Sequence, residues 1–91
     1  MPYREIYAYY GKDPNDMIHV TVKLFATLRQ NREKEQIMEL PHGAAIKDII
    51  ELLNIPQKEA AILMINGRGA KLDAILQDND TVSIFPPLGG G

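Results

Sequence analysis

One stretch of the chain has the residue spacing of an amphipathic helix, and strand-like patterns lie on both sides of it. Apolar residues recur there at i, i+3, i+4 and i+7, with charged residues on the opposite side. Asn54 and Pro56 end the pattern. The apolar stripe is Ile46, Ile49, Ile50 and Leu53, and the residues expected to face solvent are Lys47, Asp48 and Glu51. The chain therefore has one helix with which to cover the sheet that its strands form.

The start of this helix lacks the usual N-cap residue. Ala44 or Ala45 occupies the position where Ser, Thr, Asp or Asn would accept a hydrogen bond from a backbone N–H of the first turn. We expect this alanine to cost about 1 kcal/mol of stability.

Strand patterns occur in five segments. Residues 17–25 alternate between apolar and polar side chains, so one face of this strand should be buried. Residues 36–40 should pair with it as an antiparallel hairpin, across a mixed-charge run at 29–35 that we expect to be a solvated loop. The remaining predictions are a buried strand at 60–65, a brief edge strand at 69–71 and a closing strand at 81–85.

Turn residues separate these segments. Asn66-Gly67 is a hairpin dipeptide, and Asn79 tolerates the left-handed conformation in the turn before the closing strand. Leu72, Ile75 and Leu76 are expected to fill the core from a short turn. The order of elements predicts an α+β protein with a β-grasp, or ubiquitin-like, fold, in which one main helix packs across a mixed four- to five-stranded sheet.

A chain of 91 residues is long enough for one domain. We divide it into an N-terminal extension at 1–16, a β-grasp domain at 17–85 and a flexible C-terminal glycine tail at 86–91. The extension is either a partly ordered arm or a contact for a partner, since the spacing of its tyrosines fits a helix face and a strand face equally well. All four tyrosines of the chain lie in it: Tyr3, Tyr7, Tyr9 and Tyr10.

Composition excludes several classes of function. The net charge is −2, and no basic cluster offers a footprint for nucleic acid. The absence of cysteine excludes disulfides, thiolate nucleophiles and cysteine-ligated metals. No apolar run is long enough to span a bilayer, and the N-terminus lacks the apolar core of a secretory signal. We therefore expect a cytoplasmic protein that binds neither nucleic acid nor a membrane.

Other motifs do not make a reactive site. His19 and His42 lie on different elements without a spaced second ligand, so no metal site is predicted. Asp78 and Asp80 lack the glycine and the final glutamate of a calcium loop, and we expect both to be turn residues. Gly67-Arg68-Gly69 lacks the third glycine and the following helix of a dinucleotide fingerprint. No bound cofactor is predicted.

The C-terminus is left as the candidate reactive group. The closing strand runs into two prolines, one leucine and three glycines. The prolines end the strand and project the tail in an extended form, and glycines without Cβ can enter a narrow site. The terminal carboxylate is ionised at pH 7 and needs activation, for example as an acyl-adenylate, before it can react. A frayed terminus is the alternative interpretation.

Several stretches resemble the molybdopterin synthase small subunits and the related ubiquitin-like sulfur carriers. Residues 22–29 resemble the first strand of that family and the turn after it. Residues 65–67, 72–73, 76 and 78–82 resemble later positions of that family. The most specific part is residues 84–90, with a phenylalanine, two prolines and terminal glycines. Thiamine sulfur carriers share the fold but are typically shorter and lack the double proline.

The resemblance implies a protein that is not catalytic alone but forms the small subunit of a molybdopterin synthase. An E1-like adenylating enzyme would use ATP to adenylate the terminal glycine, and sulfur would replace the adenylate to give a thiocarboxylate. The tail would then enter the large synthase subunit and donate sulfur to a pterin precursor of the molybdenum or tungsten cofactor. Gly91 and Gly90 would carry the chemistry, and the contacts with partners would come from Phe85, Pro86, Pro87, Leu88 and Gly89.

The chain departs from that family in four places. It ends in three glycines where the family has two, so the acceptor carboxyl is that of Gly91 or, after trimming, of Gly90. Ala45 stands where relatives usually have threonine, and Asn79 where they usually have glycine. The extension at 1–16 lies outside the family core. Another sulfur acceptor, such as thiamine, an amino acid or tRNA, and a role as a ubiquitin-like protein modifier are the alternative functions.

Overall fold

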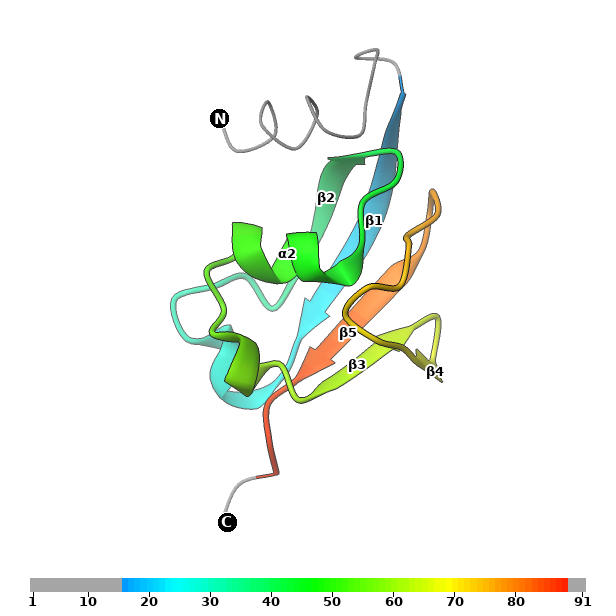
Figure 1. Ribbon diagram of the computed structural model, residues 1–91. Coiled ribbons are helices and arrows are strands. Elements are labelled where there is room, and N and C mark those ends of the chain that lie inside the picture. Colours follow the sequence, from blue (N-terminus) through cyan, green and yellow to red (C-terminus); the bar gives the residue numbers. More distant parts are fainter. Residues whose placement is uncertain (1–15, 89–91) are drawn as a thin grey trace.

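The computed structural model describes residues 16–88, which form a five-stranded sheet crossed by one α-helix (Figure 1). The order β2-β1-β5-β3-β4, with β1 and β5 parallel and the other pairs antiparallel, confirms the predicted mixed sheet of β-grasp type. Two 3-10 helices lie in the loops. The elements are β1 (Met17–Leu24), η1 (Ala26–Arg29), β2 (Glu35–Pro41), α2 (Ile46–Leu52), η2 (Gln57–Glu59), β3 (Ile62–Ile65), β4 (Arg68–Gly69) and β5 (Thr81–Phe85).

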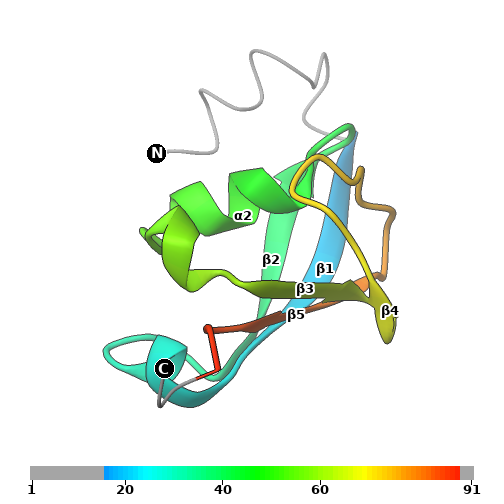
Figure 2. The same ribbon diagram turned by 60° about the horizontal axis from the view of Figure 1, so that its bottom comes forward.

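The helix α2 covers one face of the sheet, and in residues 16–88 no α-helix covers the other (Figure 2). The alternation along β1 places Val20, Val22 and Leu24 in the core, as predicted. Val82 and Ile84 of β5 continue the same buried layer. We call the opposite side of the sheet the open face.

The N-terminus of α2 confirms the missing N-cap and corrects one prediction. Ala45 is the N-cap residue and offers no side-chain acceptor. Asp48, which we expected to face solvent, is buried, and its carboxylate accepts the backbone N–H of Ala45 at 2.8 Å. The third residue of the helix thus makes one half of a capping box, which partly compensates for the alanine.

A side-chain acceptor at the N-cap is expected to stabilise the fold. Ala45→Ser places a hydroxyl within reach of a backbone N–H of the first helical turn, and the free energy of unfolding should rise by about 1 kcal/mol. Urea denaturation measures the change. Ala44→Ser is the matched control, because it buries a hydroxyl beside the cap position and should lower stability. Equal effects of the two substitutions would contradict the capping explanation.

Two predictions about apolar residues are wrong in detail. The segment at 60–65 is not buried throughout, because β3 begins at Ile62 and alternates, so that Leu63 faces the core and Ile62 is 43% exposed. Ile75, which we expected in the core, is 55% exposed. Leu76 beside it is buried as predicted, and Leu72 packs against the edge of the core.

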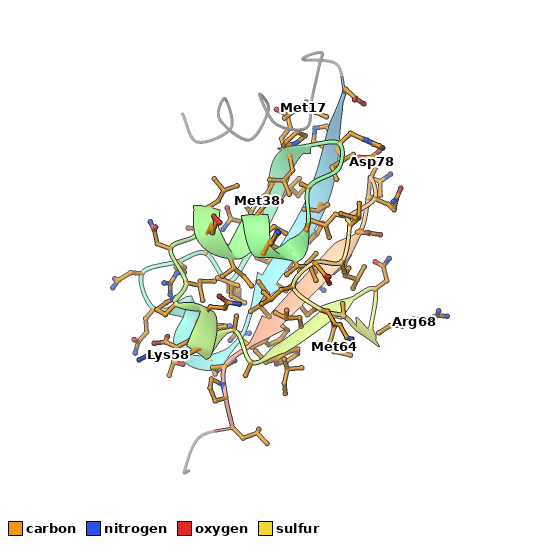
Figure 3. The ribbon with its side chains drawn as sticks, viewed as in Figure 1. Met17, Met38, Lys58, Met64, Arg68 and Asp78 are labelled. Carbon is orange, nitrogen blue, oxygen red and sulfur yellow. The ribbon has the colours of Figure 1, made fainter. Side chains whose placement is uncertain are left out.

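The predicted turns are confirmed. Asn66 and Gly67 have φ angles of 52° and 82°, the left-handed values that a two-residue hairpin turn requires. This turn joins β3 to β4, and Arg68 points away from the body of the protein there (Figure 3). Asn79 has a φ of 71°, so it adopts the left-handed conformation for which glycine is the more usual residue.

The two aspartates beside Asn79 support turns, as predicted. Asp80 is buried, and its carboxylate accepts hydrogen bonds from the Asn66 side-chain amide at 2.9 Å and the Gln77 backbone N–H at 2.8 Å. Asp78 lies beside the start of β1 (Figure 3) and accepts the backbone N–H of His19 at 2.8 Å. Hydrogen bonds of this kind fix the turn that leads into β5.

Within residues 16–88, no helix is long and apolar enough to cross a membrane. The tyrosines of the N-terminal extension lie outside the described residues, as do Gly89, Gly90 and Gly91. The predictions for those positions stay predictions.

Candidate functional site

Two phenylalanine rings stack at the end of β5, where the chain leaves the sheet. Because β1 and β5 run parallel, both end at the same edge, and Phe25 follows β1 there while Phe85 closes β5. Their rings stack with centroids 4.2 Å apart and an angle of 10° between planes. We call Phe25, Phe85, Pro86, Pro87 and Leu88 the tail root.

Backbone hydrogen bonds hold the stack from both sides. The Phe25 N–H donates to the carbonyl of Ile84 at 3.2 Å, and the Ala61 N–H donates to the carbonyl of Phe85 at 2.9 Å. Of the last two residues before the prolines, Ile84 is thus bonded to the segment after β1 and Phe85 to the segment before β3. The direction in which the tail departs is fixed by the sheet.

Arg29 of η1 extends this arrangement. Its Nε donates to the carbonyl of Leu24 at 2.8 Å, and its guanidinium carbon lies 5.4 Å from the centroid of the Phe25 ring. This distance is within the range of a cation–π contact. A surface pocket of about 270 Å³ beside the ring is lined by Lys23, Leu24, Phe25, Arg29, Lys34 and Glu35, so basic side chains predominate next to the stack.

The tail root exposes apolar surface. Pro86 is half-buried, Pro87 is exposed, and Leu88 is 86% exposed. Ile62 pairs with Phe85 across β3 and β5, and it adds apolar surface on the open face. Figure 1 shows the chain departing from this edge beyond β5. The predicted partner-binding residues 85–88 therefore lie together at an accessible end of the sheet.

Sequence reasoning missed Phe25, Arg29 and Ile62 as parts of this site. The alternation at 17–25 puts Phe25 on the same side of the first strand as its polar residues. The sequence does contain a hint of the stack, because two of the expected strands, at 17–25 and 81–85, each end in a phenylalanine. What the sequence did not contain was the parallel pairing that brings the two ends together.

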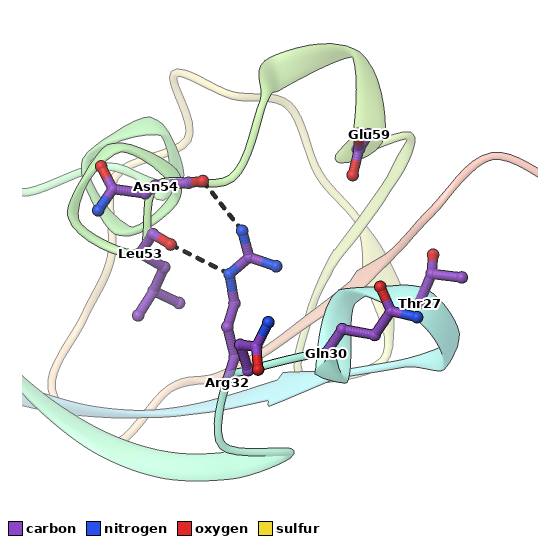
Figure 4. Close-up of a pocket in the computed structure, with 7 residues that line it drawn as sticks. Thr27, Gln30, Arg32, Leu53, Asn54 and Glu59 are labelled. Atoms are coloured by element: carbon purple, nitrogen blue, oxygen red, sulfur yellow. Dashed lines mark hydrogen bonds between the residues drawn. The ribbon is translucent and has the colours of Figure 1, made fainter.

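A surface hollow of about 410 Å³ lies beside the C-terminus of α2 (Figure 4). Its central side chain is Arg32, whose Nε donates to the carbonyl of Leu53 at 3.1 Å while a terminal nitrogen donates to that of Asn54 at 2.9 Å. A further bond goes to the carbonyl of Leu28 at 3.3 Å. The run at 29–35 is therefore not only a solvated loop, because Arg29 and Arg32 both bind backbone carbonyls.

Arg32 is expected to stabilise the fold rather than bind a ligand. Arg32→Ala leaves the last carbonyls of α2 without this cation, and the free energy of unfolding should fall by about 1–2 kcal/mol. Arg32→Lys should recover only part of the loss, since a single ammonium cannot reproduce the planar fork. Urea denaturation checks both values. Identical stability of Arg32→Ala and the native protein would contradict this role.

Histidines and carboxylates do not form a metal centre in residues 16–88. His19 Nε2 lies 3.2 Å from a Glu39 carboxylate oxygen, and both side chains are more than half exposed. His42 lies beyond β2, and its backbone N–H donates to the carbonyl of Asp16. These contacts belong to the β1–β2 pair and lie away from the tail root.

Comparison with known proteins shows what kind of chain carries this tail. The sequence model described as the ThiS family matches residues 22–91, from the middle of β1 through the terminal glycines. The chain belongs to the ThiS family of ubiquitin-like sulfur carriers. This confirms the resemblance seen in the sequence. Among curated proteins, none matches the chain at a significant level.

Solved structures show the same fold. A candidate molybdopterin converting factor, subunit 1, from Pyrococcus furiosus is 32% identical, with a TM-score of 0.62 over 78% of this chain and 99% of that one. SAMP1 from Haloferax volcanii is 19% identical, with a TM-score of 0.66 over 80% and 99%. The complex of subunits 1 and 2 of the Helicobacter pylori molybdopterin-converting factor is 22% identical. Its TM-score is 0.55, over 81% of this chain and 100% of the matched one. The last two likenesses concern the fold alone.

The tail root holds the start of the C-terminal segment, because Phe85 is stacked and hydrogen-bonded while the prolines after it lack N–H groups. Leu88 then marks the last residue that the structure describes.

Proposed function

We propose that this protein carries sulfur as a thiocarboxylate on its C-terminal glycine and delivers it in molybdopterin synthesis, for the molybdenum or tungsten cofactor. The observation that carries the proposal is the 32% identity to the Pyrococcus furiosus converting-factor subunit over almost the whole of that chain. The double proline that follows the aromatic stack supports it.

The chemistry requires a partner enzyme at the first step. An E1-like enzyme binds ATP, and an oxygen of the Gly91 carboxylate attacks the α-phosphorus, which forms the acyl-adenylate and releases pyrophosphate. Hydrosulfide supplied by a donor then attacks the acyl carbon, forms the C–S bond and displaces AMP. Loss of its proton leaves a thiocarboxylate in which one oxygen has been replaced by sulfur. Gly91, and Gly90 if the tail is trimmed, is the proposed reacting position.

The same tail root serves two partners in turn. The terminal carboxylate must reach first the adenylating enzyme and then the large subunit of the synthase. Phe85, Pro86, Pro87 and Leu88 are the proposed contacts, with Gly89 entering the narrow part of each site. Exposed Leu88 and half-exposed Ile62 support a shared apolar docking surface.

Transfer to a pterin precursor tests the proposal. The thiocarboxylated protein is mixed with a molybdopterin synthase large subunit and its precursor, and intact mass and pterin product are followed together. We expect the carrier to return to the carboxylate mass as sulfur appears in the product. Sulfur that stays on the carrier, beside a large subunit that is active with its own small subunit, would exclude this acceptor.

A second candidate function is that of a protein modifier. It is favoured by the likeness to small archaeal modifier protein 1, which reaches 25% identity and a TM-score of 0.61 for the Methanosarcina acetivorans protein. In that role the adenylated terminus would form an isopeptide bond with a lysine of a target. Isopeptide-linked adducts that end in this glycine tail, found by peptide mass spectrometry, would support it.

A further inference from the structure

The outer edge of β2 carries an apolar side chain that the sulfur chemistry does not use. β2 is an end strand of the sheet, and Ile37 at its middle is 72% exposed on the open face. Ile37 lies apart from Phe85 and the residues after it, since β1 lies between β2 and β5, whereas Glu35 at the start of β2 lines the pocket beside the Phe25 ring. A long edge strand with an exposed isoleucine is a template for a further strand.

Two hydrogen bonds identify which backbone groups of β2 point outward. Leu24 N–H donates to the carbonyl of Lys34 at 2.8 Å, and His42 N–H donates to that of Asp16 at 3.0 Å. Hydrogen-bonded pairs alternate along an antiparallel ladder, so the residues of β2 with even numbers direct their backbone groups at β1. Glu35, Ile37 and Glu39 then direct their N–H and C=O groups away from the sheet. Ile37 thus offers an exposed side chain and an outward backbone pair at one position.

Charge limits what can pair with this edge. Glu35 and Glu39 flank Ile37 at two residues on either side, so their side chains share its face. A second copy that paired antiparallel about Ile37 would set Glu35 opposite Glu39 twice, and like charges directly opposite are destabilising. Toward β1, Glu35 is paired with Lys23 and Glu39 with His19, so each glutamate already has a basic residue opposite it. Basic residues are therefore the charge complement of this face.

We propose that the β2 edge docks an extended segment of a partner protein, in which a β-branched apolar residue is flanked at two residues on either side by Lys or Arg. The apolar residue would lie opposite Ile37, and the two basic residues opposite Glu35 and Glu39. The segment adds a sixth strand through the outward backbone groups. Docking here leaves Phe85 and the tail after it accessible, so a partner can hold the carrier while its terminus is in another active site.

A peptide pair tests the charge rule. The probe is the labelled peptide Thr-Lys-Val-Val-Thr-Lys-Thr, and the control has glutamate at both lysine positions. Fluorescence anisotropy with the full chain at low salt should show the lysine peptide binding about tenfold more tightly. Glu35→Gln combined with Glu39→Gln leaves the backbone unchanged and should remove most of that preference. Equal binding of the two peptides to the native protein would overturn the proposal.

A proline at the centre of the edge tests the geometry. The N–H of Ile37 points outward, so Ile37→Pro removes no hydrogen bond to β1 but removes a donor that the added strand needs. We expect peptide affinity to fall by more than about tenfold, with the amides of Gln36 and Met38 still protected from hydrogen exchange. Ile37→Thr keeps the backbone donor and should lose less peptide affinity than Ile37→Pro.

Three other outcomes would overturn the proposal. The first is that Ile37→Pro binds the lysine peptide with the same affinity as the native chain. The native chain could sediment as a dimer that Ile37→Pro abolishes, which would make a second copy the occupant. Deletion of residues 1–15 could raise peptide affinity by more than about tenfold, which would make the chain's own N-terminal segment the occupant.

Discussion

Deletion of Gly90 and Gly91 together is expected to abolish adenylation and thiocarboxylate formation while leaving the fold unchanged. The shortened chain would end at Gly89, and two extended residues span about 7 Å, so its carboxylate could not reach the α-phosphorus of bound ATP. A displacement of about 1 Å can cost a hundredfold in rate, so we expect activity to fall by more than that factor. ATP–pyrophosphate exchange with the activating enzyme measures the first step.

Deletion of Gly91 alone separates the two proposed acceptor positions. If Gly91 is the reacting residue as it stands, this variant should also lose adenylation, because its carboxylate is one residue short. Unfolding in urea should match that of the native protein in both deletions, since the core ends at Ile84. Full activity of the single deletion would transfer the role to Gly90.

Breaking the aromatic stack is expected to weaken partner docking at the tail root. Phe85→Ala removes the ring that lies 4.2 Å from Phe25, and truncation of a central aromatic contact typically costs about 2 kcal/mol of binding, or roughly thirtyfold. The loss should fall mainly on KM in the adenylation assay, because the terminal carboxylate itself is unchanged. The free energy of unfolding should fall by about 1–2 kcal/mol.

Leucine substitutions distinguish stacking from apolar burial. Phe25→Leu and Phe85→Leu keep apolar volume but remove the offset ring contact. If the two rings act as one unit, the double variant should lose less than the sum of the single variants, by about 0.5–1.5 kcal/mol. Strict additivity, in both unfolding and KM, would contradict a shared role for the pair.

Periodicity predicted the core of this fold because it reports burial directly. The alternation along β1 and the i, i+3, i+4 stripe of α2 each define one apolar face. The apolar face of the strand and that of the helix are both buried. Periodicity did not predict where polar groups find partners. Asp48 was expected in solvent because its side of the helix is charged, yet Ala45 leaves a backbone N–H for it to accept.

Residues distant in the sequence account for the rest. Arg32 looked like part of a solvated charge run, because its acceptors on Leu53 and Asn54 are 21 and 22 residues away. The tail root likewise depends on contacts between residues that are distant in the sequence. Phe85 and the prolines could be predicted from the local sequence, whereas Phe25 joined the site only through the parallel pairing of β1 with β5.

The intact mass of the protein tests the central claim most directly. The full chain is incubated with ATP, an activating enzyme and a sulfur donor, and its C-terminal peptide is then analysed. The account predicts that one oxygen is exchanged for sulfur and that fragmentation places the sulfur on the last glycine. An unchanged mass, in the presence of an activating enzyme that thiocarboxylates its own carrier in the same buffer, would contradict it.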